Sequence, residues 1–417
     1  MEFLDIIAIL LTLAALFAYV NHRYIKLPIT IGIMLISLIV SLLMIAVGQF
    51  NPAFDDTAEE FVASIDFNEA LMNCMLSYLL FAGALHVKLN YLKEQKRLVA
   101  IMATVGVTFS TFAVGSAAYF IFNMLSVDIP YAWCLVFGAL IAPTDPVAVL
   151  GILKTAGAPK SLETKITGES LFNDGVGVVI YLVLVGIATT GIGNVTIGSV
   201  THDFFLEAGG GILLGLILGF ICYKMLKSID NYHVEVLLTL ALVTAGYRFA
   251  MSYHLSGPLA MVVAGLMIGN HARDNAMSEQ TRNNIDTFWE LIDEILNAVL
   301  FLLIGLEIFI LDFSTPVIIA GLILIPVSLL VRYLSSGATV GLLGKMGKEF
   351  SPGVVKILTW GGIRGGISVA LALAIPKEAG DARTHILVVT YIIVIFSIAV
   401  QGLTLKPLIS KALAKNN

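Results

Sequence analysis

The feature that most constrains this chain is its succession of long apolar segments. About 13 stretches reach the roughly 17–25 mostly apolar residues that a helix needs to cross a bilayer. Composition agrees, because the chain is 58% hydrophobic and 13% charged, whereas a soluble domain has about 25% charged residues. The excess apolar surface must face lipid. The sequence therefore predicts an all-α polytopic membrane protein, with residues 1–417 forming a single membrane domain.

The distribution of Lys and Arg predicts how the chain is oriented. If the N-terminus lies outside, the outer loops contain only Lys377 and Arg383, and Arg248, Arg332 and Arg364 lie within or near spans. All other Lys and Arg residues then fall in cytoplasmic loops, as the positive-inside rule requires. The sequence thus predicts an outer N-terminus, a cytoplasmic C-terminus and an odd number of spans.

Two of the predicted spans contain residues that interrupt a helix. The fifth span reads APTDP at residues 142–146, where two prolines remove backbone donors and clash with the preceding turn. The twelfth reads WGGIRGG at residues 360–366, and glycine weakens a helix. Broken backbone at membrane depth occurs only where protein or a wet cavity satisfies it. Paired interruptions in opposite halves are typical of secondary transporters built from inverted repeats.

The sixth span concentrates polar residues, with the sequence GESLFNDGV at residues 168–176. Ser170 and Asp174 are four residues apart and share one helix face, whereas Glu169 and Asn173 share a neighbouring face. Intramembrane charges are costly and are usually functional. We expect Glu169 to reach Arg364 and hold the sixth and twelfth spans together.

Oxygen atoms suitable for a hard monovalent cation come from the interrupted fifth span and from the sixth span. Asp145, Thr144, Ser170 and Asp174 supply carboxylate and hydroxyl oxygens, which such ions prefer. Each feature also has a purely structural interpretation. The interruption at Asp145 could be only a kink in the helix. The Glu169–Arg364 pair is expected to be a structural ion pair that does not bind the transported ion.

Two further sets of charged residues lie in the later predicted spans. Arg332 is expected to bond to backbone carbonyls. Glu290, Asp293 and Glu294 share one helix face near the cytoplasmic end of the tenth span. A solvated funnel wall is favoured for these acids over a second ion site.

Three motifs together resemble the signatures of one family. APTDPVAV at residues 142–149, GESLFNDGV at 168–176 and GGIRGGIS at 361–368 are similar to motifs of the monovalent cation:proton antiporter-1 family. That family includes the NhaP-type prokaryotic sodium/proton antiporters and the animal sodium/proton exchangers. The resemblance covers essentially the whole membrane domain and keeps the motif order.

The resemblance implies a fold and a division of the chain. The fold is the NhaA-like antiporter fold of about 13 transmembrane helices, with inverted repeats and two crossing interrupted helices. A homodimer is implied, with residues 1–97 and 234–311 as its dimerisation part. The core transport part is expected at 98–190 and 317–408, and a linking helix at 204–225.

The resemblance also implies roles for individual residues. Asp174 is similar to the essential ion- and proton-binding aspartate, and Thr144, Asp145 and Ser170 to its co-ligands. Asn173 matches the asparagine of electroneutral members. Glu169 and Arg364 match a stabilising pair.

One position departs from the family pattern. Ala82 stands where relatives often have an acid, so any role of that acid in ion access or pH control must be met otherwise here. Regulation through a long cytoplasmic tail, as in the animal exchangers, is not expected here.

These expectations combine into one functional hypothesis. The chain is expected to exchange Na⁺, and also Li⁺, for H⁺ in a one-for-one electroneutral cycle, by competition at Asp174. It is expected to be neither an enzyme nor a cofactor protein, to have no nucleic-acid partner, and to lie in the inner membrane of a prokaryote. Two alternatives stay open, namely a K⁺/H⁺ antiporter on the same scaffold and a gated cation channel or pH sensor.

Overall fold

The protein is helical throughout the part that can be described. The computed structural model describes residues 3–48, 75–145, 149, 153, 160–190, 197–310, 313–348, 350 and 353–414. Within these ranges no strand occurs. The expectation of an all-α fold is therefore confirmed.

The described helices follow one another in the order that the apolar segments predict. Their bounds are α1 Phe3–Val20, α2 Ile29–Gly48, α5 Leu76–His86, α6 Leu89–Ile101, α7 Val107–Met124, α8 Tyr131–Ile141, α10 Lys160–Thr190, α11 Ile197–Leu226, α12 Tyr232–Ser252, α13 Gly257–Leu266, α14 Arg273–Asn275, α15 Glu279–Glu307, α16 Thr315–Lys345, α17 Val354–Trp360, α18 Gly366–Leu373, α19 Asp381–Phe396 and α20 Leu403–Ala414. Short helical turns join several of them, namely η1 Asn21–Ile25, η3 Met102–Gly106, η5 Met267–Ala272, η6 Ile308–Ile310, η7 Lys377–Ala379 and η8 Ser397–Gly402.

Most predicted spans correspond to continuous helical rods. Eight rods in the described ranges are long and apolar enough to cross a membrane, and α5 and α8 are shorter apolar helices. Some rods combine several elements, since α6, η3 and α7 form one span over Glu94–Met124. The total of about 13 spans stays a prediction.

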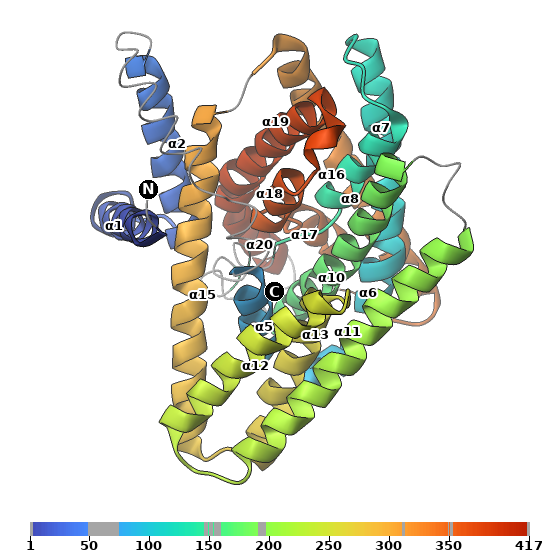
Figure 1. Ribbon diagram of the computed structural model, residues 1–417. Coiled ribbons are helices and arrows are strands. Elements are labelled where there is room, and N and C mark those ends of the chain that lie inside the picture. Colours follow the sequence, from blue (N-terminus) through green and yellow to red (C-terminus); the bar gives the residue numbers. More distant parts are fainter. Residues whose placement is uncertain are drawn as a thin grey trace.

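One helix, α10, occupies the middle of the bundle (Figure 1). It packs against α8, α6 and α13, while α15 runs along one side and packs against α2 and α5. On the other side of α8, α7 and α16 pack together, and α16 also packs against α19. This arrangement places the polar face of α10 among helices rather than against lipid.

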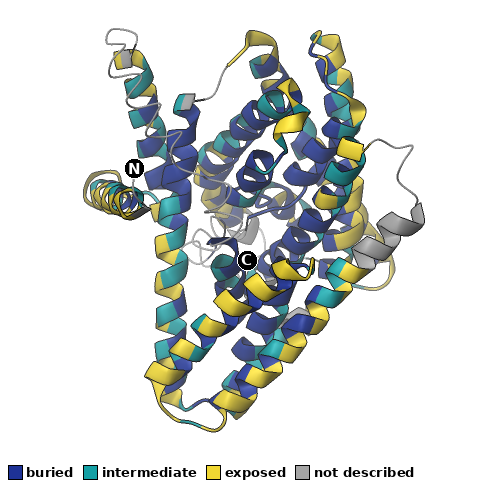
Figure 2. Ribbon diagram, in the orientation of Figure 1, coloured by how far each residue is buried: buried dark blue, intermediate teal, exposed yellow. Residues whose placement is uncertain are grey.

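The outer surface of the bundle is apolar. Exposed residues follow the outward sides of α1, α11 and α12 (Figure 2). They include Leu4, which is 73% exposed, and Leu213, which is 59% exposed. A long helix that leaves such side chains uncovered fits a lipid environment, because water would penalise that surface.

Candidate functional site

Both predicted helix interruptions are confirmed. Helix α8 ends at Ile141, and the backbone is non-helical over residues 142–145. Helix α17 ends at Trp360 and α18 begins at Gly366, with residues 362–365 non-helical between them. Proline and glycine account for the two interruptions. Pro146, the second proline of the first motif, lies outside the described residues.

The two interruptions lie against each other. The Asp145 backbone N–H donates to the Ile363 carbonyl at 2.8 Å. A Cβ atom on Gly365 would come within 1.8 Å of Asp145 Oδ2, so only glycine allows the carboxylate to lie against this backbone. The two non-helical segments, which are far apart in the chain, thus contact each other directly.

Arg364 satisfies the carbonyl groups that the proline interruption leaves open. Its Nη1 donates to the Ala142 and Pro143 carbonyl oxygens at 2.6 Å each. Its backbone N–H donates to Ser397 Oγ at 2.8 Å. Arg364 is 5% exposed, so it joins the two interruptions from inside the protein.

The predicted Glu169–Arg364 pair is wrong, because Glu169 pairs with Arg332. Arg332, on α16, donates Nη2 to Glu169 Oε2 at 2.8 Å and Nη1 to Glu169 Oε1. A guanidinium fork matches a carboxylate with two parallel hydrogen bonds. Arg364 is engaged by the freed carbonyls, so the two arginines exchange the roles that the sequence suggested. The buried pair therefore joins α10 to α16.

Three polar side chains join the first interruption to α10. Thr144 Oγ1 lies 2.9 Å from Ser170 Oγ. Asn173 Nδ2 donates to Thr144 Oγ1 at 2.9 Å, and Asn173 Oδ1 accepts from the Thr144 backbone N–H at 3.3 Å. Thr144 is 2% exposed, Ser170 1% and Asn173 0%. The structure therefore brings Thr144 of the first motif together with Ser170 and Asn173 of the second.

Asp174 has a buried carboxylate oxygen that no described group bonds to. It is 2% exposed, and its Oδ1 atom has no hydrogen-bond partner. Its carboxylate interacts electrostatically with those of Asp145 and Glu169. A buried charge without a partner is costly, and nearby like charges increase the cost. The site therefore favours a positive charge at Asp174.

Among the described residues, the buried formal charges of the site sum to minus one. Its buried carboxylates belong to Asp145, Glu169 and Asp174, and its buried guanidiniums to Arg332 and Arg364. Three acids and two bases give a net charge of minus one when all are ionised. One proton or one monovalent cation would neutralise it.

Ser397 and Gln401 belong to the site's support, and the sequence reading missed them. Ser397 Oγ donates to Gln401 Oε1 at 2.6 Å, and Gln401 Nε2 donates to the Trp360 carbonyl at 3.0 Å. Both residues are buried in the last span. Their signal was a hydroxyl and an amide four residues apart in an otherwise apolar helix.

The remaining predicted residues lie around this centre. Ala82 is fully buried in α5 and has no side-chain oxygen. On α15, Asp293 is half-buried and interacts electrostatically with Asp145, whereas Glu290 and Glu294 are exposed. This exposure pattern fits the solvated wall expected for these acids, and the funnel itself stays a prediction.

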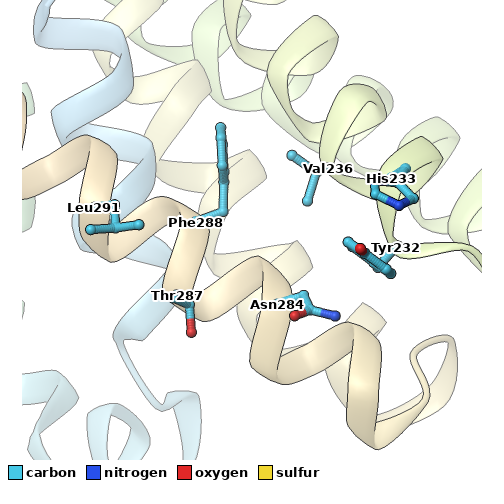
Figure 3. Close-up of a pocket in the computed structure, with 7 residues that line it drawn as sticks. All are labelled: Tyr232, His233, Val236, Asn284, Thr287, Phe288 and Leu291. Carbon is cyan, nitrogen blue, oxygen red and sulfur yellow. The ribbon is translucent and has the colours of Figure 1, made fainter.

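One described pocket lies elsewhere in the protein. It has a volume of about 350 Å³ and opens between α12 and α15 (Figure 3). Tyr232, His233 and Val236 line it from α12, and Asn284, Thr287, Phe288 and Leu291 line it from α15. None of the candidate site residues reaches it, so we do not connect it with the site.

Fold and site together define a class of protein, a polytopic helical membrane protein with buried carboxylates beside two interrupted helices. Comparison with known proteins identifies the family. The model of the transmembrane sodium/hydrogen exchanger family matches residues 10–411. The chain belongs to the sodium/hydrogen exchanger family.

Individual relatives agree with the family match. The chain is 47% identical over 415 residues to the Na⁺/H⁺ antiporter NhaP of Pseudomonas aeruginosa, covering 99% of this chain and 97% of that protein. It is 34% identical to the Na⁺/H⁺ antiporter NhaH of Halobacillus dabanensis, covering 93% of each chain. The solved structure of the sodium proton antiporter MjNhaP1 from Methanocaldococcus jannaschii has the same fold, with a TM-score of 0.76, 22% identity, and coverage of 99% of this chain and 100% of that one.

Proposed function

We propose that this protein exchanges Na⁺ for H⁺ across a membrane, with Asp174 as the group for which the two ions compete. One observation carries the proposal: Asp174 is buried with its Oδ1 unpartnered. The excess of one negative charge among the described buried groups of the site supports it. The relatives named as Na⁺/H⁺ antiporters support the same passengers.

The proposed site gives Na⁺ a set of oxygen ligands. Asp174 supplies a carboxylate oxygen, and Ser170 and Thr144, already within 2.9 Å of each other, supply hydroxyls. Asp145 adds a second carboxylate from the interruption. Carboxylate and hydroxyl oxygens suit a hard cation of single charge. No cofactor or covalent step enters this scheme.

Competition couples the two fluxes. A proton on Asp174 removes the negative charge that Na⁺ needs, so only one passenger binds at a time. Either passenger neutralises the site, whereas the empty site keeps a charge that is costly to move through an apolar barrier. The protein therefore alternates between its two open sides only when loaded, and the gradient of one ion drives the movement of the other.

Removing the Asp174 carboxylate tests the site directly. Asp174→Asn is expected to lower sodium-driven proton movement in proteoliposomes by at least about 100-fold, because the carboxylate for which the two passengers compete is removed. A dequenching proton probe measures the rate. Asp274→Asn, at an exposed position, is the matched control and should keep the wild-type rate. Sodium-driven proton movement retained in Asp174→Asn would refute the assignment.

The pH dependence tests the competition. Where Asp174 is largely protonated, each unit decrease in pH should raise the apparent half-saturation concentration of Na⁺ about tenfold, because the two ligands exclude each other. At high pH the concentration should level off. A half-saturation concentration that does not change with pH would contradict a shared site.

The cycle is proposed to be electroneutral. Asn173 is an amide that bonds to Thr144, so the site has no second carboxylate at this position to carry an extra proton. The exchange rate in proteoliposomes should therefore not respond to an imposed membrane potential. Asn173→Asp adds the missing charge and provides the comparison variant.

A panel of ions separates the remaining alternatives. Na⁺ and Li⁺ are proposed to drive proton movement, and K⁺ is not. A response to K⁺ alone would favour the K⁺/H⁺ alternative. A channel would show single-channel currents in a planar bilayer, whereas a one-for-one exchanger should show none.

Architecture and location complete the proposal. We infer a homodimer in the inner membrane of a prokaryote, with the N-terminus outside, in which a core part moves against a dimerisation part. Cross-linking between cysteines placed on α1 tests the dimer, and cysteine accessibility tests the orientation.

A further inference from the structure

A buried lysine lies near the start of α10 without a counter-ion among the described residues. Lys165 is only 8% exposed, and no hydrogen bond or ion pair joins its ammonium group to another described residue. Its Nζ atom lies 5.6 Å from the centre of the Phe350 ring. An ammonium ion that is buried without an acceptor is costly, because water no longer solvates its charge.

A second ammonium group lies beside the same ring. Lys348 Nζ is 5.9 Å from the centre of the Phe350 ring and donates to the Glu94 carbonyl at 3.1 Å. The turn that ends α16 fixes this lysine, since Gly347 has a φ of 85° and the Lys348 backbone N–H donates to the Leu343 carbonyl at 3.0 Å. An aromatic ring attracts each cation within about 6 Å. The two like charges nevertheless repel each other.

The neighbouring charges leave this group positive. Burial lowers the pKa of Lys348, and the Arg97 guanidinium lowers it further, whereas the Glu94 carboxylate raises it. Glu94 is exposed, and its backbone carbonyl rather than its carboxylate accepts from Lys348. Glu163 is two residues before Lys165 on α10, so it lies about 160° away around the helix. The two lysines and Arg97, with the single carboxylate of Glu94, therefore sum to a charge of plus two.

The basic group lies at one membrane face. The three candidate spans that contain α6, α10 and α16 begin or end at Glu94, Lys165 and Lys345. These span ends are neighbours, because Lys348 bonds to Glu94 and shares a ring contact with Lys165. Lys348 is half-buried and Arg97 is exposed, so the group is open to that face. It therefore lies at the level where the helices leave the apolar part of a bilayer.

A phosphate group matches this arrangement. Its oxygens are negatively charged acceptors, and the ammonium and guanidinium groups are charged donors. Lipid phosphates lie at the level of the span ends, where basic side chains attract them. Membrane topology alone accounts for lysines at a cytoplasmic face. It does not account for a buried lysine that shares one ring with a second lysine.

We propose that Lys165, Lys348 and Arg97 form a site for a phosphate group at this membrane face, supplied either by a lipid headgroup or by a free phosphate ion. The phosphate oxygens accept hydrogen bonds from both ammonium groups, and their charge removes the repulsion between α10 and the end of α16. The site is separate from the ion-binding centre, since Lys165 is nine residues before Asp174, about 13.5 Å along the axis of α10. The inference does not depend on the proposed exchange.

Two probes distinguish the sources of the phosphate group. Delipidated protein in a neutral detergent is mixed with phosphatidylglycerol, and the retained lipid is counted by native mass spectrometry, with phosphatidylcholine as the uncharged comparison. Equilibrium dialysis against radiolabelled inorganic phosphate measures binding of the free ion. Preferential retention of phosphatidylglycerol supports the site with a lipid source, and binding of inorganic phosphate supports it with a soluble source. The absence of both would overturn the proposal.

Variants of the two lysines locate the binding. Lys165→Gln and Lys348→Gln should each weaken binding about tenfold, because each removes a charge-assisted hydrogen bond. Lys227→Gln, at an exposed position after α11, is the matched control and should bind as the wild type does. If the control and both lysine variants bind equally, the lysines serve membrane topology alone and the proposed site does not exist.

Thermal unfolding distinguishes a binding site from a structural contact. Without an added anion, Lys165→Gln should unfold at the wild-type temperature or above it, because the variant relieves a repulsion between buried charges. Phosphatidylglycerol should raise the unfolding temperature of the wild type but not of the variant, since a ligand stabilises the folded state that binds it. A variant that is less stable by the same amount with and without lipid would show a structural role and refute the site.

The half-buried lysine provides a second test that is less demanding on folding. If Lys165→Gln cannot be recovered folded, the same comparison is made with Lys348→Gln, whose side chain is partly in solvent. Loss of the lipid-induced or phosphate-induced gain in unfolding temperature supports the site. A gain equal to that of the wild type refutes it.

Discussion

Glu169 and Asp174 are five residues apart on α10 and almost equally buried. They differ in the hydrogen bonds that their carboxylates accept. Glu169 accepts two hydrogen bonds from one guanidinium, whereas Asp174 Oδ1 accepts none. A permanently paired acid stabilises the helix contact and has no charge left for a passenger. An acid left open is costly to the fold and available to a cation. Within two turns of one helix, the charge of Glu169 is therefore structural and that of Asp174 is available for function.

The largest expected effect on stability comes from breaking the buried ion pair between Glu169 and Arg332. Arg332→Ala leaves Glu169 as an uncompensated buried charge, so the free energy of unfolding should fall by about 3–5 kcal/mol. Asp174→Asn removes a buried charge whose Oδ1 has no hydrogen-bond partner and should not destabilise the protein. Denaturant or thermal unfolding in detergent measures both variants.

A double variant sharpens the same result. Glu169→Gln combined with Arg332→Gln removes both charges, so it should be more stable than Arg332→Ala alone. The pair would not be energetically coupled if the double variant lost as much unfolding free energy as the Glu169→Gln and Arg332→Gln single variants lose together.

A smaller effect is expected at the arginine that joins the interruptions. Arg364→Lys keeps the charge but replaces the guanidinium fork by a shorter ammonium group, so the contacts with the Ala142 and Pro143 carbonyls should be weakened or lost. Unfolding free energy should fall by about 1–3 kcal/mol for each carbonyl left unsatisfied. Hydrogen exchange at residues 142–145 should increase. Unchanged exchange there would show that Arg364 does not hold the interruption.

The smallest effect is expected at Ser397. Ser397→Ala removes the acceptor of the Arg364 backbone N–H, at a cost of about 1 kcal/mol. Exchange activity should persist, because the Arg364 guanidinium stays in place. A loss of activity comparable with Asp174→Asn would place Ser397 among the ion ligands instead of the support.

The fold class and both helix interruptions were predicted from the sequence. They follow from local chemistry, since apolar length, proline and glycine act over a few residues. The grouping of Thr144 with Ser170 was expected from their ligand chemistry and the family resemblance, whereas the bonds from Asn173 to Thr144 were not predicted. The arginine pairing was predicted incorrectly. Glu169 had two buried arginines available from later spans, and the choice depends on which one the freed carbonyls of residues 142 and 143 engage. That competition is set by three-dimensional packing, which residue spacing does not encode.

The bond between Arg364 and the Ala142 carbonyl also bears on how the protein is made. Its two ends are 222 residues apart. At a translation rate of about 5–20 residues per second, α8 must wait roughly 10–40 s in the membrane before its partner emerges from the ribosome. During that interval the open carbonyls need water or the insertion machinery as a temporary partner. Biogenesis of this exchanger is therefore most vulnerable between the insertion of its two halves.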